Sequence, residues 1–181
     1  RGSKHMFFAT IGTGVGGAFI IDGRIWHGTA GFAGEFGYVA VNSDGMRLEE
    51  VASGENIVRR TKARLHQDST SSLNRIREQS LTIDDILSAA VAEDDFARLI
   101  LERTGNYIGT AVASVINLLN METIVVGGPT MIAGNVVLNS IIRSARELSF
   151  SPSFESTLIL AGELGERAAA CGAALLSIGN Q

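Results

Sequence analysis

The chain has 181 residues, carries a formal net charge of −4 and is 45% hydrophobic, which fits one globular domain or most of one. The small negative charge argues against a surface that attracts nucleic acid or membrane. A single cysteine, Cys171, excludes a disulfide framework and a cysteine-rich zinc site and suits a reducing compartment, so we expect a cytoplasmic protein that binds no membrane.

Residues 1–6 have the sequence of a tag or cleavage remnant and are set apart from the native chain. Apolar and β-branched runs follow at once and predict strands at about 7–11, 15–21 and 24–27, which form an antiparallel meander. Most domains have some lead-in before their first strand. We therefore expect residues 7–181 to be the second half of a longer protein.

A glycine-rich turn, Gly12-Thr13-Gly14-Val15-Gly16-Gly17, joins the first two predicted strands. Glycine allows a ligand to approach the backbone closely, and successive N–H groups in such a turn can converge on an anion. The turn predicts a phosphate-cradling hairpin, and a turn without ligand is the alternative. The dinucleotide fingerprint is rejected because a strand follows rather than a helix, and the P-loop is rejected because Ala18 and Phe19 replace its Lys and Ser/Thr.

A second glycine-rich segment, residues 28–38, contains four glycines and one acid, Glu35. So many glycines predict a loop rather than a helix, with a short strand to follow at 39–41. A carboxylate only accepts hydrogen bonds, so Glu35 suits the hydroxyl groups of a sugar. A solvated loop acid is the alternative for a glutamate considered alone.

Helical spacing predicts a helical insertion at about 54–119, made of helices at about 54–67, 82–91 and 93–119. Ser53 is placed to cap the first helix, and Thr82 and Asp85 form a capping box for the second. In the long third helix we interpret Gly105 and Gly109 as positions of close packing.

The first predicted helix is basic, with Arg59, Arg60, Lys62 and Arg64. A nucleic-acid contact is one interpretation, but no aromatic residues interleave, so the pattern favours a solvated helix face. The polar segment 69–72 is expected to be a mobile linker.

The C-terminal third predicts alternating elements: a strand at 123–126, a helix at about 131–148, a strand at 156–160 and a helix at 166–178. Gly127-Gly128-Pro129 breaks the chain directly after the first of these strands. Backbone N–H groups there could meet a nucleotide at the carboxyl end of a strand. Together the elements predict an α/β protein with a mixed sheet and helices packed against it.

These segments resemble, in the same order, the C-terminal half of the ROK family of repressors, open reading frames and sugar kinases. The matching segments are 12–17, 33–37, 48–49 with 52–54, 124–128 and 172–177. The resemblance implies the C-terminal half of the actin-like, ribonuclease-H-like ATPase fold: a mixed five-stranded sheet that starts with an antiparallel meander and has flanking helices. In this family sugar and nucleotide bind between the two halves.

The resemblance also implies two sets of binding residues. The nucleotide and phosphate set comprises Gly12, Thr13, Gly14, Gly127 and Gly128. The sugar set comprises Glu35 and Glu49, whose carboxylates would share one pocket. Tyr38 departs from the family pattern; it could offer its hydroxyl to the sugar, and a packing role is the alternative. ATP or ADP is thus a candidate ligand, although no cofactor is assigned.

The departures from the family pattern concern metal and catalysis. Tyr38 stands where family members usually have a histidine that serves sugar and zinc, and the short loop 41–47 replaces their cysteine-rich zinc loop. We therefore predict no zinc and no other metal. The family kinases carry their phosphate motif and their catalytic Asp in the first half, so we assign no catalytic residue here and do not expect this chain alone to be an enzyme.

Two functions follow from the resemblance. The first is the sugar-sensing effector domain of a ROK transcriptional regulator, which binds a small sugar or sugar phosphate, reaches DNA only through a missing N-terminal domain, and forms a homo-oligomer. The alternative is the C-terminal half of a glucokinase-like, ATP-dependent sugar kinase. Loss of the zinc loop favours the regulator, and retention of the Gly12-Thr13-Gly14 turn favours the kinase.

Overall fold

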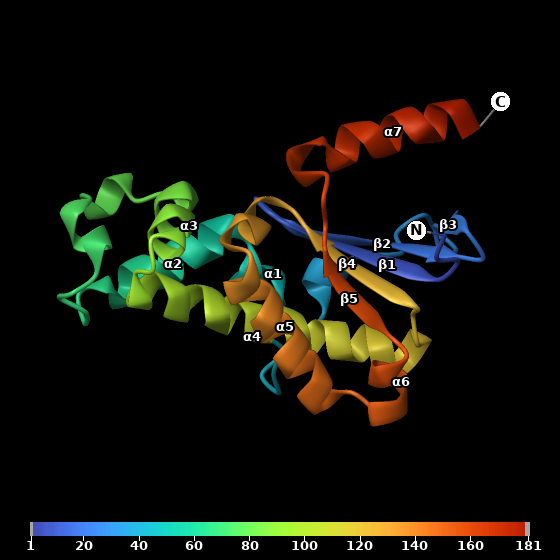
Figure 1. The fold of residues 1–181 in the computed structure, drawn as a ribbon, viewed down its shortest axis with the longest axis horizontal. Coiled ribbons are helices and arrows are strands. Elements are labelled where there is room, and N and C mark those ends of the chain that lie inside the picture. The colour runs from blue at the N-terminus through green and yellow to red at the C-terminus, as the bar shows by residue number, and fades with distance from the viewer. Residues whose placement is uncertain (1, 180–181) are drawn as a thin grey trace.

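The computed structural model describes residues 2–179, and a mixed five-stranded sheet forms its centre (Figure 1). The strands are β1 (Met6–Ile11), β2 (Val15–Ile21), β3 (Arg24–Trp26), β4 (Thr123–Gly127) and β5 (Leu158–Ala161). Their order is β3-β2-β1-β4-β5, in which β1 to β3 form an antiparallel meander and β4 and β5 run parallel to β1. The predicted fold class is confirmed.

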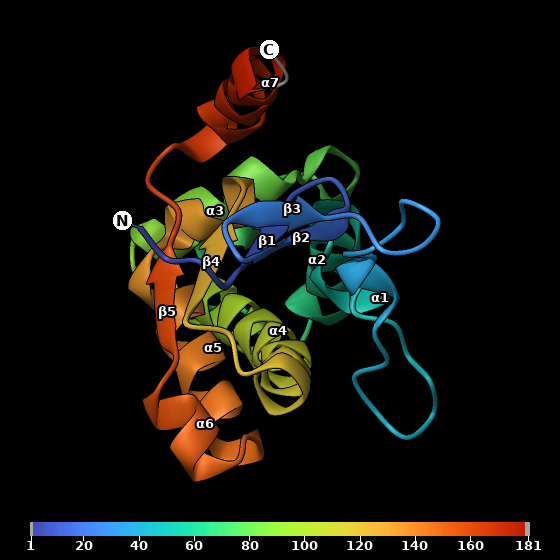
Figure 2. The ribbon, with the colours of Figure 1, turned by 90° about the vertical axis from the view of Figure 1, so that its right-hand side faces the viewer.

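The helices fill the connections between these strands. They are α1 (Glu49–Ala52), α2 (Gly54–Leu65), α3 (Ile83–Val91), α4 (Asp95–Leu119), α5 (Asn135–Leu148), α6 (Ser151–Glu155) and α7 (Ala168–Gly179). Figures 1 and 2 show α4 and α5 on one face of the sheet and α7 on the opposite side, apart from it. Within residues 2–179, no helix combines the length and apolar character that crossing a membrane requires.

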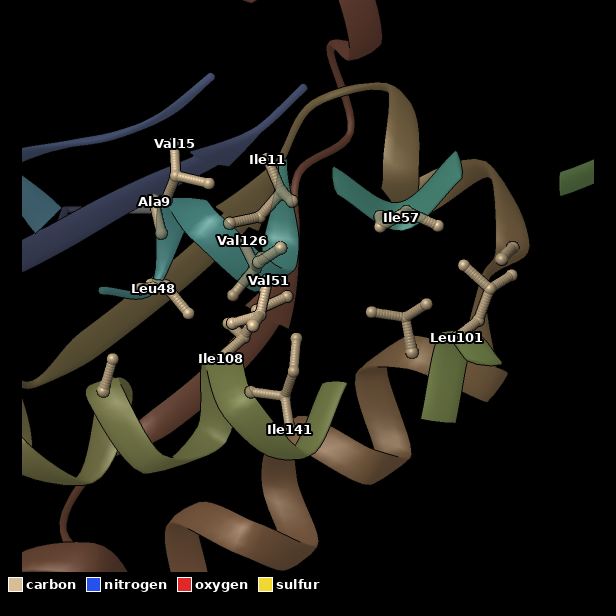
Figure 3. Close-up of a cluster of buried hydrophobic side chains, with 14 of the residues drawn as sticks. Ala9, Ile11, Val15, Leu48, Val51, Ile57, Leu101, Ile108, Val126 and Ile141 are labelled. Carbon is tan, nitrogen blue, oxygen red and sulfur yellow. The ribbon is translucent and has the colours of Figure 1, made fainter. Parts of the chain in front are cut away.

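The core lies between the sheet and α4 and α5. Alternation along β1 turns Ala9 and Ile11 to the same face, where both are fully buried. Val126 of β4 joins them from the neighbouring strand, and Ile108 of α4 and Ile141 of α5 meet them from the helical layer (Figure 3). The same cluster continues into the helical insertion, so sheet and insertion share one core.

Helices α4 and α5 pack closely because α4 carries glycines at the contact. A Cβ on Gly105 would lie 2.7 Å from the Cβ of Ser140, and one on Gly109 would lie 2.7 Å from the Cβ of Ser144. Both distances are shorter than carbon atoms tolerate, so only glycine fits at this separation of the two helices. The predicted close-packing role of the two glycines is confirmed.

The predicted helix starts are confirmed as well. The Ser53 side chain accepts a hydrogen bond from the backbone N–H of Asn56 at the start of α2. At the start of α3, Thr82 and Asp85 satisfy each other's backbone N–H groups in a capping box.

Two predicted elements differ near the C-terminus. The helix predicted at 131–148 is divided into a 3₁₀ turn, Pro129–Ala133, and α5, because Gly134 between them has a φ of 60° that a continuing helix cannot contain. The strand predicted from residue 156 begins at Leu158, because the short helix α6 precedes it.

Two further segments depart from the sequence prediction. In place of a strand at 39–41 there is an isolated bridge between Ala40 and Arg47. The segment predicted as a mobile linker is tethered, because Asp94 accepts hydrogen bonds from the hydroxyl of Ser71 and from the backbone N–H of Ser72. The tether joins residues on different elements, so local composition did not indicate it.

Candidate functional site

The two predicted glycine turns lie side by side at the carboxyl ends of the parallel strands β1 and β4. The register pairs Thr10 of β1 with Gly127 of β4, so both strands end at the same edge of the sheet. A Cβ on Gly12 would lie 3.2 Å from Cδ of Pro129. The structure therefore brings together the two turns that were assigned to nucleotide and phosphate.

Gly128 shows how tightly the two turns are packed. Its φ is 98°, a conformation that favours glycine, and a Cβ there would meet the carbonyl oxygen of Ile11. The backbone of one turn thus rests on the end of the other strand. Gly162, directly after β5, extends the group: its Cβ position lies 3.4 Å from Cα of Gly127.

The start of α2 holds the first turn in place. The backbone N–H of Gly54 donates to the carbonyl oxygen of Gly12 at 2.7 Å, and inside the turn the N–H of Gly12 donates to the carbonyl oxygen of Gly14 at 3.0 Å. Sequence reasoning used Ser53 only as a helix cap and missed this contact of Gly54. The available signal was the matching segment 52–54, whose spatial partner no local pattern reveals.

Glu49 lies against the same turn. Its Oε2 atom accepts a hydrogen bond from the backbone N–H of Val15 at 2.8 Å and lies 3.0 Å from the Cβ position of Gly14. A side chain on Gly14 would crowd this carboxylate, which gives a physical reason for glycine there. Glu49 is half-buried, whereas Thr13 and Gly14 are exposed at the tip of the turn.

The loop that carries Glu35 and Tyr38 packs on this assembly. Gly34 has a φ of 98°, and a Cβ there would meet the carbonyl oxygen of Gly17. A Cβ on Gly37 would lie 2.5 Å from the carbonyl oxygen of Val15 and 3.2 Å from Cβ of Glu49. The segments that bear all three predicted sugar-binding residues are therefore in contact.

The exposed Glu35 also lines a cavity that is separate from the contact between Glu49 and the glycine turn. A cavity of about 240 Å³ between the sheet and the C-terminal half of α4 is bounded by Glu35 together with residues such as Phe36 and Leu118. Glu49 does not line this cavity. The shared pocket for the two carboxylates stays a prediction, although their two loops meet at Gly37.

Tyr38 and the loop after it are held by the chain's own groups. The side chain of Tyr38 is 60% exposed, and the Arg47 guanidinium lies 4.4 Å from the centre of its ring. Between them the loop is closed by the Val41 N–H donating to the Met46 carbonyl at 2.8 Å, and by the Asn42 side chain accepting from the Met46 N–H at 2.9 Å.

These residues do not fit the zinc that the family resemblance implies. Structural zinc takes thiolate and imidazole ligands, and residues 38–47 contain neither a cysteine nor a histidine. In the part of the chain that the structure describes, no three His, Cys, Asp or Glu side chains gather as a metal site.

The arrangement suits two kinds of chemistry. Thr13 and Gly14 are exposed at the tip of the first glycine turn, and backbone N–H groups in such a turn favour phosphate oxygens. The carboxylates of Glu35 and Glu49 accept hydrogen bonds only, which favours hydroxyl donors. A phosphate-bearing nucleotide and a sugar are the ligand classes that these groups could hold.

The chain is similar to known proteins. Residues 1–180 match the ROK family. A glucokinase of Halalkalibacterium halodurans is 38% identical over 151 residues, which cover 77% of this chain and 46% of that protein. The DNA-binding transcriptional repressor Mlc of Escherichia coli is 27% identical over 184 residues, which cover 97% of this chain and 45% of the repressor.

Solved structures of a kinase and of a regulator are also similar to this chain. A ROK family glucokinase from Streptomyces griseus, in complex with glucose and AMPPNP, superposes with a TM-score of 0.87 at 28% identity, covering 97% of this chain and 61% of that one. A ROK family transcriptional regulator, a homologue of E. coli Mlc, has a TM-score of 0.79 at 30% identity, covering 87% and 41%. The chain spans about half the length of the curated relatives described above. From the sequence match over residues 1–180 and from these structures, the chain belongs to the ROK family.

Proposed function

We propose that this chain is the sugar-sensing effector domain of a ROK family transcriptional regulator. The observation that carries the proposal is the segment from Tyr38 to Arg47, where the chain departs from the zinc-binding pattern of the family resemblance and closes the loop with its own hydrogen bonds and the Tyr38–Arg47 contact. A sensor has to hold a sugar, whereas a kinase must also align a hydroxyl, a phosphate and a base. A regulator can therefore function with a shorter loop that lacks the zinc ligands, because the loop only has to help hold the sugar.

The ligand in this proposal is a small sugar or sugar phosphate. Glu35 and Glu49 accept hydrogen bonds from its hydroxyl groups, and Tyr38 offers a phenolic hydroxyl. One oxygen of Glu49 already holds the Val15 N–H, which leaves the other oxygen for the ligand. Hydrogen bonds to an ionised carboxylate are among the stronger ones, so a few of them can fix a sugar.

A bound sugar would connect two segments that already touch, the loop with Glu35 and the start of α1 with Glu49. The loop with Glu35 packs on the start of β2, where Gly37 lies against Val15. Glu49 contacts the same residue, because its carboxylate accepts the hydrogen bond of the Val15 N–H. A ligand that bonds to both acids would stiffen this contact. The regulator would pass that change to DNA through a separate N-terminal domain, and it would act as a homo-oligomer.

The second candidate is the C-terminal half of an ATP-dependent sugar kinase. The observation in its favour is the close packing of the two glycine turns, which suits a nucleotide bound at Gly12, Thr13, Gly14, Gly127 and Gly128. The 38% identity with a glucokinase points the same way. The same turns also support the sheet edge, so they serve a sensor equally well.

The test uses the longer parent protein, its operator DNA and a panel of glucose, xylose and N-acetylmannosamine. The regulator predicts that one sugar releases the protein from operator DNA in a fluorescence-anisotropy titration. Glu35→Ala and Glu49→Gln should remove the release without weakening DNA binding, and Glu78→Ala, an exposed residue outside the site, should respond normally. A parent that binds no DNA and phosphorylates a sugar in a coupled ATP assay would overturn the proposal.

A further inference from the structure

A second polar pocket lies between α2 and α4, away from the glycine turns. Its volume is about 350 Å³, and it is lined by Arg60 and Arg64 of α2 and by Arg103, Asn106, Tyr107 and Thr110 of α4. None of the residues assigned to sugar or nucleotide contributes to it. The three arginines come from two helices and surround one small cavity, which a helix face that only contacts solvent does not explain.

Arg60 is fixed on one wall of this pocket. Its Nη1 atom donates to the carbonyl oxygen of Val51 at 2.6 Å and to the hydroxyl of Thr104 at 3.1 Å. Its guanidinium lies 5.5 Å from the centre of the Tyr107 ring. Its Nη2 atom also donates to the carbonyl oxygen of Ile100 at 3.5 Å, which leaves the Nε–H and one N–H of Nη2 for a ligand. Because the guanidinium is held in place, these donors keep a defined direction, which lowers the entropy lost when a ligand binds.

The positive charge of the pocket is not balanced by a carboxylate. No Asp or Glu lines the cavity. Burial lowers the pKa of Arg60, and although Tyr107 opposes this effect, the neighbouring Arg64 and Arg59 lower that pKa further. An anion in the pocket would relieve this repulsion.

The remaining lining also provides donors. The Oδ1 atom of Asn106 accepts from Nη2 of Arg143 at 3.4 Å, which leaves the amide nitrogen of Asn106 as a donor group. Arg143 of α5 does not line the pocket but holds the Asn106 side chain through this bond. Arg64 and Arg103 are exposed and can close over a ligand from opposite helices.

We propose that this pocket is a binding site for a small molecule that carries a phosphate group. Guanidinium groups bind phosphate oxygens through paired hydrogen bonds, and several of them around one cavity match the several oxygens of a phosphate. The volume is that of a small-molecule site rather than of an extended groove for a nucleic acid. The site is independent of the proposed sugar site, so either proposal can fail alone.

The experiment measures binding to the 181-residue chain by isothermal titration at constant ionic strength. The probes are inorganic phosphate, glucose 6-phosphate and glucose. The proposal predicts saturable binding of one or both phosphate compounds at one site. Binding of both identifies the phosphate group as the determinant, whereas binding of glucose 6-phosphate alone identifies a phosphate ester.

Variants locate the site. Arg64→Gln and Arg103→Gln remove exposed side chains that the fold does not need, and each should raise the Kd of the phosphate compound about tenfold, the effect of losing one charged hydrogen bond. The double variant should bind no phosphate within the range tested. Arg77→Gln, an exposed arginine that does not line the pocket, and Glu35→Ala should leave the Kd within about twofold.

Three results would overturn the proposal. The first is an absence of saturable phosphate binding, and the second is an unchanged Kd in the double variant when circular dichroism shows that it is folded. The third is binding of a single-stranded oligonucleotide that depends on Arg64 and Arg103 while neither phosphate compound binds, because that pattern assigns the arginines to nucleic acid. A loss of sugar response in Glu35→Ala concerns the sugar site alone.

Discussion

The carboxylate of Glu49 accepts the backbone N–H of Val15 at 2.8 Å, across a separation that joins the start of α1 to the start of β2. This bond fixes the end of the glycine turn to the segment that follows the Tyr38 loop. Glu49 therefore has a structural task in addition to the role proposed for it in binding a sugar, and the two can be separated by experiment.

Removing the Glu49 carboxylate should weaken the fold. Glu49→Ala leaves the N–H of the buried Val15 without its partner, which should lower the free energy of unfolding by about 1–3 kcal/mol. Glu49→Gln keeps an oxygen acceptor and should cost less. Urea unfolding followed by circular dichroism measures both, with Glu78→Ala as the exposed control. If Glu49→Ala were as stable as the unsubstituted chain, water would satisfy the Val15 N–H.

Two glycines with positive φ should differ in their tolerance of alanine. Gly34 and Gly31 have φ values of 98° and 85°, but a Cβ on Gly34 meets the carbonyl oxygen of Gly17, whereas nothing lies within 4 Å of a Cβ on Gly31. Gly31→Ala should cost about 1 kcal/mol from backbone strain alone. Gly34→Ala should cost about 3 kcal/mol, because strain and a backbone clash combine. Thermal unfolding compares the pair, and similar losses would contradict the packing of the loop on β2.

Glycines inside helices should respond in opposite directions. Gly109→Ala in α4 places a methyl group 2.7 Å from Cβ of Ser144 and should destabilise the protein by about 2 kcal/mol through overpacking. Gly172→Ala in α7 meets nothing within 4 Å and should stabilise its helix by up to about 1 kcal/mol, because alanine is the better helix former. Chemical denaturation of both variants tests the contrast. Stabilisation by Gly109→Ala would mean that α4 and α5 lie further apart.

Stability should fall in acid through Asp94. Burial alone would raise the pKa of this carboxyl, but hydrogen bonds from Ala97, Ser72 and Ser71 outweigh it and lower the pKa overall. A group whose pKa is lower in the folded state stabilises the protein above its unfolded pKa of about 3.9, and this contribution is lost as the pH falls through the folded pKa.

Asp94→Asn therefore should be less stable than the parent sequence at neutral pH, with the two converging in acid. The free energy of unfolding, measured by urea titration from about pH 7 to pH 2.5, reports this difference. Asp95→Asn is the matched control, because no hydrogen bond to its carboxylate is found among the described residues. Parallel curves for the parent sequence and Asp94→Asn would refute the role of the tether.

Local patterns predicted most of the fold because its signals lie within a few residues of each other. The apolar run of β1, the capping box of Thr82 and Asp85, and the glycines Gly105 and Gly109 are all of this kind. Some of the misses involve partners that are distant in sequence. The bonds from Ser71 and Ser72 to Asp94 are an example, because each residue alone looks like a polar loop residue.

The difference between local signals and contacts of distant residues applies to the candidate site as well. The glycine turns could be recognised from their composition, and parallel strands place them at one edge of the sheet. The contact of Gly54 with Gly12 and the position of Arg60 over Tyr107 depend on how the helical insertion packs, which no single segment specifies. The basic stretch of α2 was therefore interpreted as a solvated face, although part of it lines a pocket.

The central place of β1 has a consequence for how the protein forms. β1 pairs at once with β2, but its other neighbour, β4, is synthesised only about a hundred residues later, after the whole helical insertion. Until then β1 presents an unpaired strand edge where β4 will later pair with it. Nascent chains halted before Thr123 are thus the species most in need of a chaperone.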